Sequence, residues 1–216
     1  MKEADMTDEI IELLQKDKAR FRAKGLFGDS RDSLSMRIPG REEFLLTFPD
    51  RNEVRTESFR NKANDEAGLH AAIYRVRKDA GAILIGRTPW SGALPAIGTA
   101  VPTLFDEQAR HIGKTEKPVR AGRGKRAVGA LKNGGNIAIY GEQRVCIGTT
   151  PDRVVFNAEL FEKCAKAYVV AHASGHRIQK VPRWVRFIAG GRLRKDQKRA
   201  AESYAEGRIP EGMNAY

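Results

Sequence analysis

The sequence predicts an α/β fold, because segments with the helical spacing of apolar residues alternate with short strand-like segments. A second observation is the composition: 41% of the 216 residues are hydrophobic and 31% are charged, the balance of a globular protein. A third observation, which concerns the domain organisation, is the strongly basic segment that follows the last apolar helix. We therefore predict one packed domain over residues 1–175 and a basic C-terminal extension over residues 176–216.

The first elements are a helix and a hairpin. Over residues 6–24, apolar side chains recur at helical spacing after Thr7, a residue type that commonly caps a helix N-terminus. Polar and apolar residues then alternate over 33–38, and a second apolar run covers 44–48. Because residues 39–40 between them read Pro-Gly, a turn signal, the pattern predicts a β-hairpin.

The middle and the end of the chain carry the remaining elements. Residues 65–78 have a helical period, and the two acids at their start suit the positive end of a helix dipole. A buried strand is predicted at 82–85, and two further strands at 136–140 and 144–148 flank a turn. A long helix with one apolar face is predicted over 152–172.

The protein is strongly basic, with 39 Lys and Arg against 27 Asp and Glu and a formal net charge of +12. Such an excess favours anionic partners, including phosphorylated metabolites, nucleic acid and acidic proteins. Ten basic residues lie within 177–208, where Trp184 and Phe187 stand among them and offer both charge and stacking to a nucleic acid. We rank nucleic-acid binding behind a solvated helical face or a subunit-packing tail, because the segment contains no recognised RNA or DNA motif.

The cysteines and the N-terminus indicate a cellular compartment. Cys146 and Cys164 form no Cys-x-x-Cys pair, which argues against a disulfide framework or a thiolate metal cluster and favours a reducing environment. The polar, acidic N-terminus does not resemble a secretory signal, and no apolar run has the length that spans a bilayer. We expect a cytoplasmic protein with no membrane association.

Three segments resemble the class II aldolase and adducin family. Residues 66–84 are similar to its central motif, in which a glutamate, here Glu66, precedes a helix and a buried strand. Residues 33–47 resemble the strand pair before that motif, and residues 137–172 resemble the family's last strand pair and closing helix. The resemblance implies a three-layer α/β/α fold with a central, mainly antiparallel sheet. It also implies a homo-oligomer, usually a tetramer, with active sites between neighbouring subunits.

The zinc-binding histidines of the family's active aldolases are replaced in this sequence. The resemblance places the three ligand positions at Ile85, Arg87 and Glu142, and an isoleucine cannot bind a metal, so zinc is expected to be absent. No other cofactor is expected. Without the cation, the negative charge that develops in aldol cleavage lacks its Lewis acid. We prefer the interpretation that Arg87 and Glu142 fill the site as an ion pair; the alternative is that Arg87 binds an oxyanion as a catalytic group.

Glu66 aligns with the family's acid/base glutamate, which moves protons beside the metal. A glutamate in a first helical turn also complements the helix dipole without any catalytic role, and both interpretations stay open. His70, one turn later, is predicted to be packed and hydrogen-bonded rather than catalytic.

The positions that bind substrate phosphate in the sugar-phosphate members read Asp32-Ser33, Thr47 to Asp50 and Asn64-Asp65 in this chain. Three added carboxylates would repel a phosphate dianion at close range, although nearby basic and hydroxyl side chains compensate in part. A sugar phosphate is therefore not the expected ligand. The candidate ligand-binding residues are Ser33, Arg37, Thr47 and Glu142, and the candidate catalytic residues are Glu66 and Arg87.

Three functions are compatible with these residues. The first is a divergent family member that binds a small oxygenated or carboxylated metabolite without zinc-dependent aldol cleavage. If active, it would be a metal-independent lyase or isomerase with Glu66 as the base and Arg87 as the electrophile. The second is a non-catalytic, adducin-like assembly domain, since a fold does not fix a function. The third, ranked last, is nucleic-acid binding through the basic tail.

Overall fold

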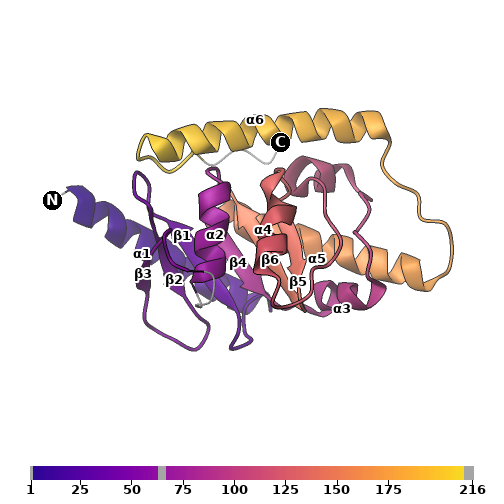
Figure 1. Cartoon of the computed structure of the whole chain (residues 1–216), viewed down its shortest axis with the longest axis horizontal. Coiled ribbons are helices and arrows are strands. Elements are labelled where there is room, and N and C mark those ends of the chain that lie inside the picture. Colours follow the sequence, from indigo (N-terminus) through magenta and orange to yellow (C-terminus); the bar gives the residue numbers. More distant parts are fainter. Residues whose placement is uncertain (1, 63–66, 212–216) are drawn as a thin grey trace.

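A six-stranded sheet runs through the centre of the protein, and helices cover both of its faces (Figure 1). The computed structural model describes residues 2–62 and 67–211. The strands lie in the order β3-β2-β1-β4-β6-β5, and every pair of neighbouring strands is antiparallel. They are β1 (Ser33–Arg37), β2 (Glu43–Thr47), β3 (Arg55–Ser58), β4 (Ala82–Gly86), β5 (Ile137–Tyr140) and β6 (Gln143–Gly148).

The helices form the two outer layers. α1 (Lys2–Ala23), α3 (Pro89–Ile97) and α5 (Pro151–Ala173) pack on one face of the sheet. α2 (Gly68–Val76) and α4 (Gly124–Lys132) pack on the other face. The three-layer α/β/α fold with an antiparallel sheet is therefore confirmed.

Alternation along the strands produces the two cores. In β1, Leu34 and Met36 point to the layer of α1 and α5, while Ser33, Ser35 and Arg37 point to the layer of α2. Each of these five residues is buried, because β1 lies near the middle of the sheet with a helical layer on each side. The polar residues of β1 must therefore find partners inside the protein.

The structure differs from the predicted elements at several places. α1 begins at Lys2, so Thr7 lies inside the helix and not at its N-cap. The edge strand β3 and the single π-helical turn η1 (Gln108–Ile112) were not predicted. The residues of β3 are polar and only partly buried, and the π-helical turn is too short to show a period.

The basic C-terminal segment contains a long helix, α6 (Arg183–Ala205), that lies across the molecule at the edge of the helical layers (Figure 1). Tyr204 is buried and its hydroxyl donates a hydrogen bond to the carbonyl oxygen of Thr149 at 2.9 Å. Gly81 makes this approach possible, because a Cβ atom there would lie 2.0 Å from the Tyr204 hydroxyl oxygen. α6 therefore packs on the domain, while the domain boundary at residue 175 stays a prediction.

None of the helices in the described part of the chain is long and apolar enough to cross a membrane. Cys146 and Cys164 are both buried free thiols, which agrees with the expected lack of a disulfide framework. Burial raises the pKa of each thiol to about 12, so neither is a reactive thiolate near neutral pH.

Candidate functional site

The candidate site lies where β4 ends and the chain enters α3. Ile85 of β4 pairs with Ser33 of β1 on one side and with Val145 of β6 on the other. Its side chain is 5% exposed and belongs to the apolar core between the sheet and α2. The first of the three positions at which the resemblance places a metal ligand is therefore occupied by a core residue.

Arg87 and Glu142 meet at this place. Arg87 directly follows β4, and Glu142 stands in the turn between β5 and β6. The distance from Arg87 Nη1 to Glu142 Oε2 is 3.3 Å, which confirms the predicted ion pair. The two side chains are 48% and 56% exposed, so the pair lies at the surface and contributes only about 0–1 kcal/mol to stability. The loss of this ion pair would therefore cost little stability.

Asp32 fixes the backbone of the candidate site. Its carboxylate accepts hydrogen bonds from the backbone N–H groups of Gly28 at 2.9 Å, Asp29 at 3.0 Å and Arg87 at 3.1 Å. Burial raises the pKa of Asp32, while the three backbone hydrogen bonds act in the opposite direction. This carboxylate is turned inward and holds the β4 exit against the loop before β1. It is a structural group, and sequence reasoning counted it only as a charge that repels phosphate.

Ser33 faces the interior and belongs to a buried hydrogen-bond network. The Ser33 hydroxyl lies 2.8 Å from His70 Nε2, and the Ser35 hydroxyl lies 2.7 Å from His70 Nδ1 and 2.9 Å from the Tyr74 hydroxyl. A neutral imidazole donates from one nitrogen and accepts at the other, and hydroxyl groups can take either role. His70 is therefore packed and hydrogen-bonded, as predicted.

Acid is expected to destabilise the protein in part through His70. Burial lowers the pKa of His70 to about 3. The unfolded chain, with an ordinary pKa of about 6.5, therefore takes up a proton before the folded protein does. The stability that depends on neutral His70 is present above pH ~6.5 and is lost as the pH falls toward 3, about 2 kcal/mol between pH 7 and pH 5.

Urea denaturation at pH 7 and pH 5 measures this loss of stability. In His70→Gln the loss between the two pH values should be about 2 kcal/mol smaller than in the unchanged protein. The matched control is His172→Gln, which changes an exposed histidine at the end of α5. Burial raises the pKa of Asp17 to about 6, an opposite contribution that is common to all three proteins. An unchanged pH dependence in His70→Gln would contradict this assignment.

The other predicted ligand-binding residues lie apart from Arg87. Arg37 stands at the end of β1 opposite to Ser33, about 13 Å away at ~3.3 Å per residue. Thr47 is buried on the other face of the sheet, with its hydroxyl 3.5 Å from the carbonyl oxygen of Glu53. Glu66 lies outside the described residues. Of the five predicted site residues that the structure describes, it therefore brings Arg87 and Glu142 alone into contact.

Sequence reasoning missed a carboxylate behind the site. Glu162 of α5 accepts hydrogen bonds from the Thr88 hydroxyl at 2.6 Å, the Trp90 N–H at 2.8 Å and the Ser91 N–H at 3.2 Å. It closes the N-terminus of α3, where backbone N–H groups have no helical acceptor. Arg144 Nη1 lies 3.9 Å from the same carboxylate. The sequence carries no signal for this contact, because Glu162 stands 72 positions from Trp90.

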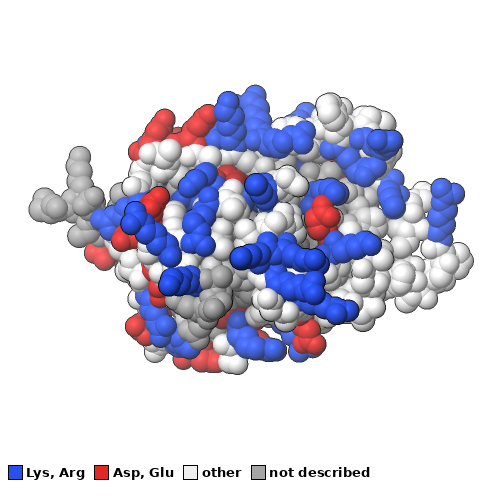
Figure 2. Space-filling model, viewed as in Figure 1, with Lys and Arg blue, Asp and Glu red and all other residues white. Residues whose placement is uncertain are grey.

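Basic side chains gather on the face that carries α4 and along α6 (Figure 2). Four of them line a hollow in front of α4: Lys117, Arg120, Arg123 and Arg126. Residues 114–126 contain six basic side chains, and part of this segment forms one electropositive surface with the start of α4. This arrangement agrees with the expectation of anionic partners.

Solved structures share this fold. An L-fuculose 1-phosphate aldolase is 15% identical, with a TM-score of 0.73 over 86% of this chain and 96% of that chain. YgbL from Escherichia coli, a putative aldolase/epimerase/decarboxylase, is 17% identical, with a TM-score of 0.68 over 84% of this chain and 98% of that one. The L-fuculose 1-phosphate aldolase from Glaciozyma antarctica is 16% identical, with a TM-score of 0.68 over 91% and 86%. At these identities the similarity establishes the fold alone.

The sequence gives the family directly. No curated protein matches the chain significantly. Residues 39–169 match the class II aldolase and adducin N-terminal domain, and this match covers more than half of the chain. It includes β2, β4 and β6, and with them the positions of Ile85, Arg87 and Glu142. The chain therefore belongs to the class II aldolase and adducin family.

Proposed function

We propose that this protein is a divergent member of its family that binds a small oxygenated or carboxylated metabolite at Arg87, without zinc-dependent aldol cleavage. The observation that carries the proposal is the ion pair of Arg87 and Glu142. These residues stand at two of the three positions at which the family resemblance places zinc ligands. The Arg87 guanidinium is half exposed, and its fork of N–H groups matches the two oxygens of a carboxylate.

The residues at these positions do not fit a catalytic zinc ion. Such an ion needs three protein ligands with nitrogen, oxygen or sulfur donors. Ile85 has none, and Arg87 would place a positive charge beside the cation. Over residues 2–62 and 67–211, no three His, Cys, Asp or Glu side chains are grouped so that they could hold a metal. We therefore assign the anion-binding role to the arginine.

Any catalysis at this site would use Arg87 to stabilise negative charge on the ligand and Glu66 to move a proton. Arg87 is well suited to the first task, because Asp32 holds its backbone and its guanidinium is half exposed. The part of Glu66 stays a prediction. A lyase or isomerase reaction on the bound metabolite matches these two roles.

A second candidate function is a non-catalytic assembly domain in the cytoplasm. The observation that favours it is a group of exposed apolar side chains at the start of α6, where Trp184, Phe187 and Ile188 are 68%, 75% and 51% exposed. Large apolar side chains that are exposed next to one another are typical of interaction surfaces. As a homotetramer, the protein would have four times the chain mass of 24.0 kDa in light scattering.

The proposed function predicts three results for the purified protein. After dialysis with zinc offered, mass spectrometry of metals should find substoichiometric zinc, and L-fuculose 1-phosphate should not be cleaved. Glycolate should bind in calorimetry, and Arg87→Met should weaken that binding at least about tenfold, since a charge-assisted bidentate contact is lost.

Arg120→Met is the matched control, because it removes an exposed arginine of the basic surface without touching the site. Stoichiometric zinc or cleavage of the sugar phosphate would contradict the proposed function. A stable oligomer that binds neither glycolate nor zinc would instead support the assembly domain.

A further inference from the structure

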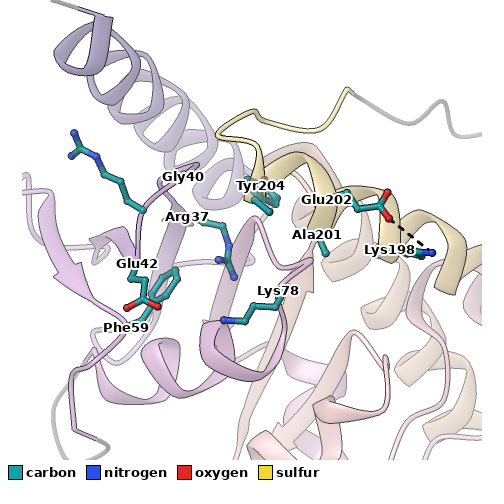
Figure 3. A pocket seen from close by; sticks show the side chains of 11 residues that line it. Arg37, Gly40, Glu42, Phe59, Lys78, Lys198, Ala201, Glu202 and Tyr204 are labelled. Atoms are coloured by element: carbon teal, nitrogen blue, oxygen red, sulfur yellow. Dashed lines mark ion pairs between the residues drawn. The ribbon is translucent and has the colours of Figure 1, made fainter.

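A second cavity lies between the C-terminal half of α6 and the β1–β2 hairpin (Figure 3). Its volume is about 570 Å³, within the range of about 300–1,000 Å³ that is usual for sites of small organic ligands. The rings of Phe59 and Tyr204 and the methyl groups of Ala201 and Ala205 supply apolar walls. This cavity has no lining residue in common with the surroundings of Arg87.

Arg37 reaches this cavity from inside the protein. Its side chain donates to the carbonyl oxygens of Ala80 at 2.7 Å, Arg77 at 3.0 Å and Tyr74 at 3.3 Å. These bonds use Nε and Nη2, and Nη1 makes no hydrogen bond with any residue that the structure describes. Arg37 is only 7% exposed and forms no ion pair with a described carboxylate. A nearly buried guanidinium thus has one free donor nitrogen in the wall of a cavity.

Aromatic rings surround the same guanidinium. Its central carbon lies 4.8 Å from the ring centre of Phe59, 5.0 Å from that of Tyr74 and 5.5 Å from that of Tyr204. Burial lowers the pKa of Arg37, but an arginine stays protonated in proteins. The rings hold the charge in place without neutralising it.

Lys78 adds a second cation that no acid neutralises. Among the described residues it has no ion pair, and in Figure 3 its ammonium group and the Arg37 guanidinium point into the same part of the cavity. The backbone of Lys78 is held in place, because the neighbouring Arg77 and Asp79 are both buried and form a bidentate ion pair. Two positive charges beside each other favour an anion between them.

The acids of the cavity are already paired. Glu42 lies 3.6 Å from Arg60, and Glu202 lies 3.9 Å from Lys198 in the adjacent turn of α6. Each carboxylate thus has a cationic partner of its own at the exposed edge of the cavity, and neither forms an ion pair with Arg37 or Lys78. The cavity combines two unneutralised cations with an apolar, partly aromatic wall, which is the complement of a carboxylate on an apolar body.

We propose that this cavity binds a small organic carboxylate, whose oxygens contact Arg37 Nη1 and the Lys78 ammonium and whose apolar body packs on Phe59, Tyr204 and Ala201. The site is separate from that at Arg87, because Arg37 and Ser33 stand at opposite ends of β1 and Ser33 pairs with Ile85. The inference goes beyond the proposed function and does not depend on it.

Benzoate is the probe for this site, and amide signals in nitrogen-15 NMR spectra of the full chain are the readout. Benzoate should shift the amide signals of Gly40, Lys78 and Ala201 in a saturable manner and leave that of Gly92, beside Arg87, unchanged. Benzamide, which has the same shape without the charge, should bind at least about tenfold more weakly. Inorganic phosphate, which lacks an apolar body, should also bind more weakly.

Lys78→Gln tests the charge without risk to the fold, because Lys78 is exposed and unpaired among the described residues. It should weaken benzoate binding at least about tenfold, whereas Lys132→Gln, which removes an exposed lysine outside the cavity, should not. Arg37→Lys keeps the charge but loses the free Nη1 and should also weaken binding. Equal binding of benzoate and benzamide, unchanged binding in Lys78→Gln, or a response centred on Gly92 would each overturn the proposal.

Discussion

Replacing Glu162 with alanine is expected to lower the free energy of unfolding by about 3–5 kcal/mol. The Glu162 carboxylate accepts three hydrogen bonds from Thr88, Trp90 and Ser91 and is the acid that forms an ion pair with Arg144. Arg144 is fully buried, and its Nε and Nη2 have no hydrogen-bond partner among the described residues. Without Glu162 the buried guanidinium would lose its counter-charge, and the N-terminus of α3 would lose its acceptors.

Urea denaturation of Glu162→Ala and Glu159→Ala makes the comparison direct. Glu159 stands one turn earlier on α5 and pairs with Lys24 at the surface, where its side chain is 39% exposed. Its removal should cost less than about 1 kcal/mol, as is usual for exposed ion pairs. If the two variants lose equal stability, Glu162 does not hold α3 and Arg144 in the way described.

Glu162 also affects the proposed ligand site. Thr88 directly follows Arg87, so the hydrogen bonds to Glu162 hold the chain just after the guanidinium that is proposed to bind the ligand. The more conservative substitution Glu162→Gln keeps one side-chain oxygen as a hydrogen-bond acceptor. A folded Glu162→Gln protein with weakened glycolate binding would show that the α5 carboxylate positions Arg87.

Replacing Asp79 with alanine is the second change with a large expected cost, again about 3–5 kcal/mol. Asp79 forms two hydrogen bonds with Arg77, at 2.8 and 2.7 Å, and both residues are buried. The remaining donors of Arg77 reach the carbonyl oxygens of Leu131 and Gly135 and the side-chain oxygen of Asn136. Asp79 supplies the only negative charge in this network of described residues, so its loss leaves a buried cation uncompensated.

Glu53→Ala is a suitable comparison for Asp79→Ala, because Glu53 pairs with Arg55 at the surface and its side chain is 64% exposed. The two variants should differ by at least about 2 kcal/mol in urea denaturation. A loss in Asp79→Ala no greater than in Glu53→Ala would show that Arg77 is held by its carbonyl partners alone. Because Lys78 stands between Arg77 and Asp79, a folded Asp79→Asn protein also tests whether this ion pair positions Lys78 for the carboxylate.

Most of the sheet and its helices were predicted, because their sequences carry strong local patterns. The hairpin of β1 and β2 follows from the alternation at 33–38 and the Pro-Gly turn, and α5 follows from its long apolar face. β3 reads Arg-Thr-Glu-Ser, which has no apolar alternation, and its strand form depends on pairing with β2. The apolar residues of α6 do not line one face of the helix, and contacts such as that of Tyr204 with Thr149 hold it in place.

The candidate site was predicted only where the resemblance supplied a position. Arg87 and Glu142 stand 55 positions apart, and no local pattern relates them; the family's ligand positions predicted their contact. Asp32 and Glu162 bind mainly backbone N–H groups, which every residue except proline carries, so the sequence gives no signal for their roles. Arg37 and Ser33, both predicted as ligand-binding residues, stand at opposite ends of β1, so the two residues do not line one site.

The docking of α6 has a kinetic consequence for the cavity at Arg37. Tyr204 bonds to Thr149, and Gln197 bonds to Gly134 and Asn136, so these contacts join residues that are 55 to 63 positions apart. Only five of the 23 residues of α6 are buried, which is typical of a segment that opens in local unfolding. Detachment of α6 would remove Tyr204 and Ala201 from the cavity while the sheet stays folded. A bound carboxylate would slow that opening, and amide hydrogen exchange along α6 would then report how often the cavity is occupied.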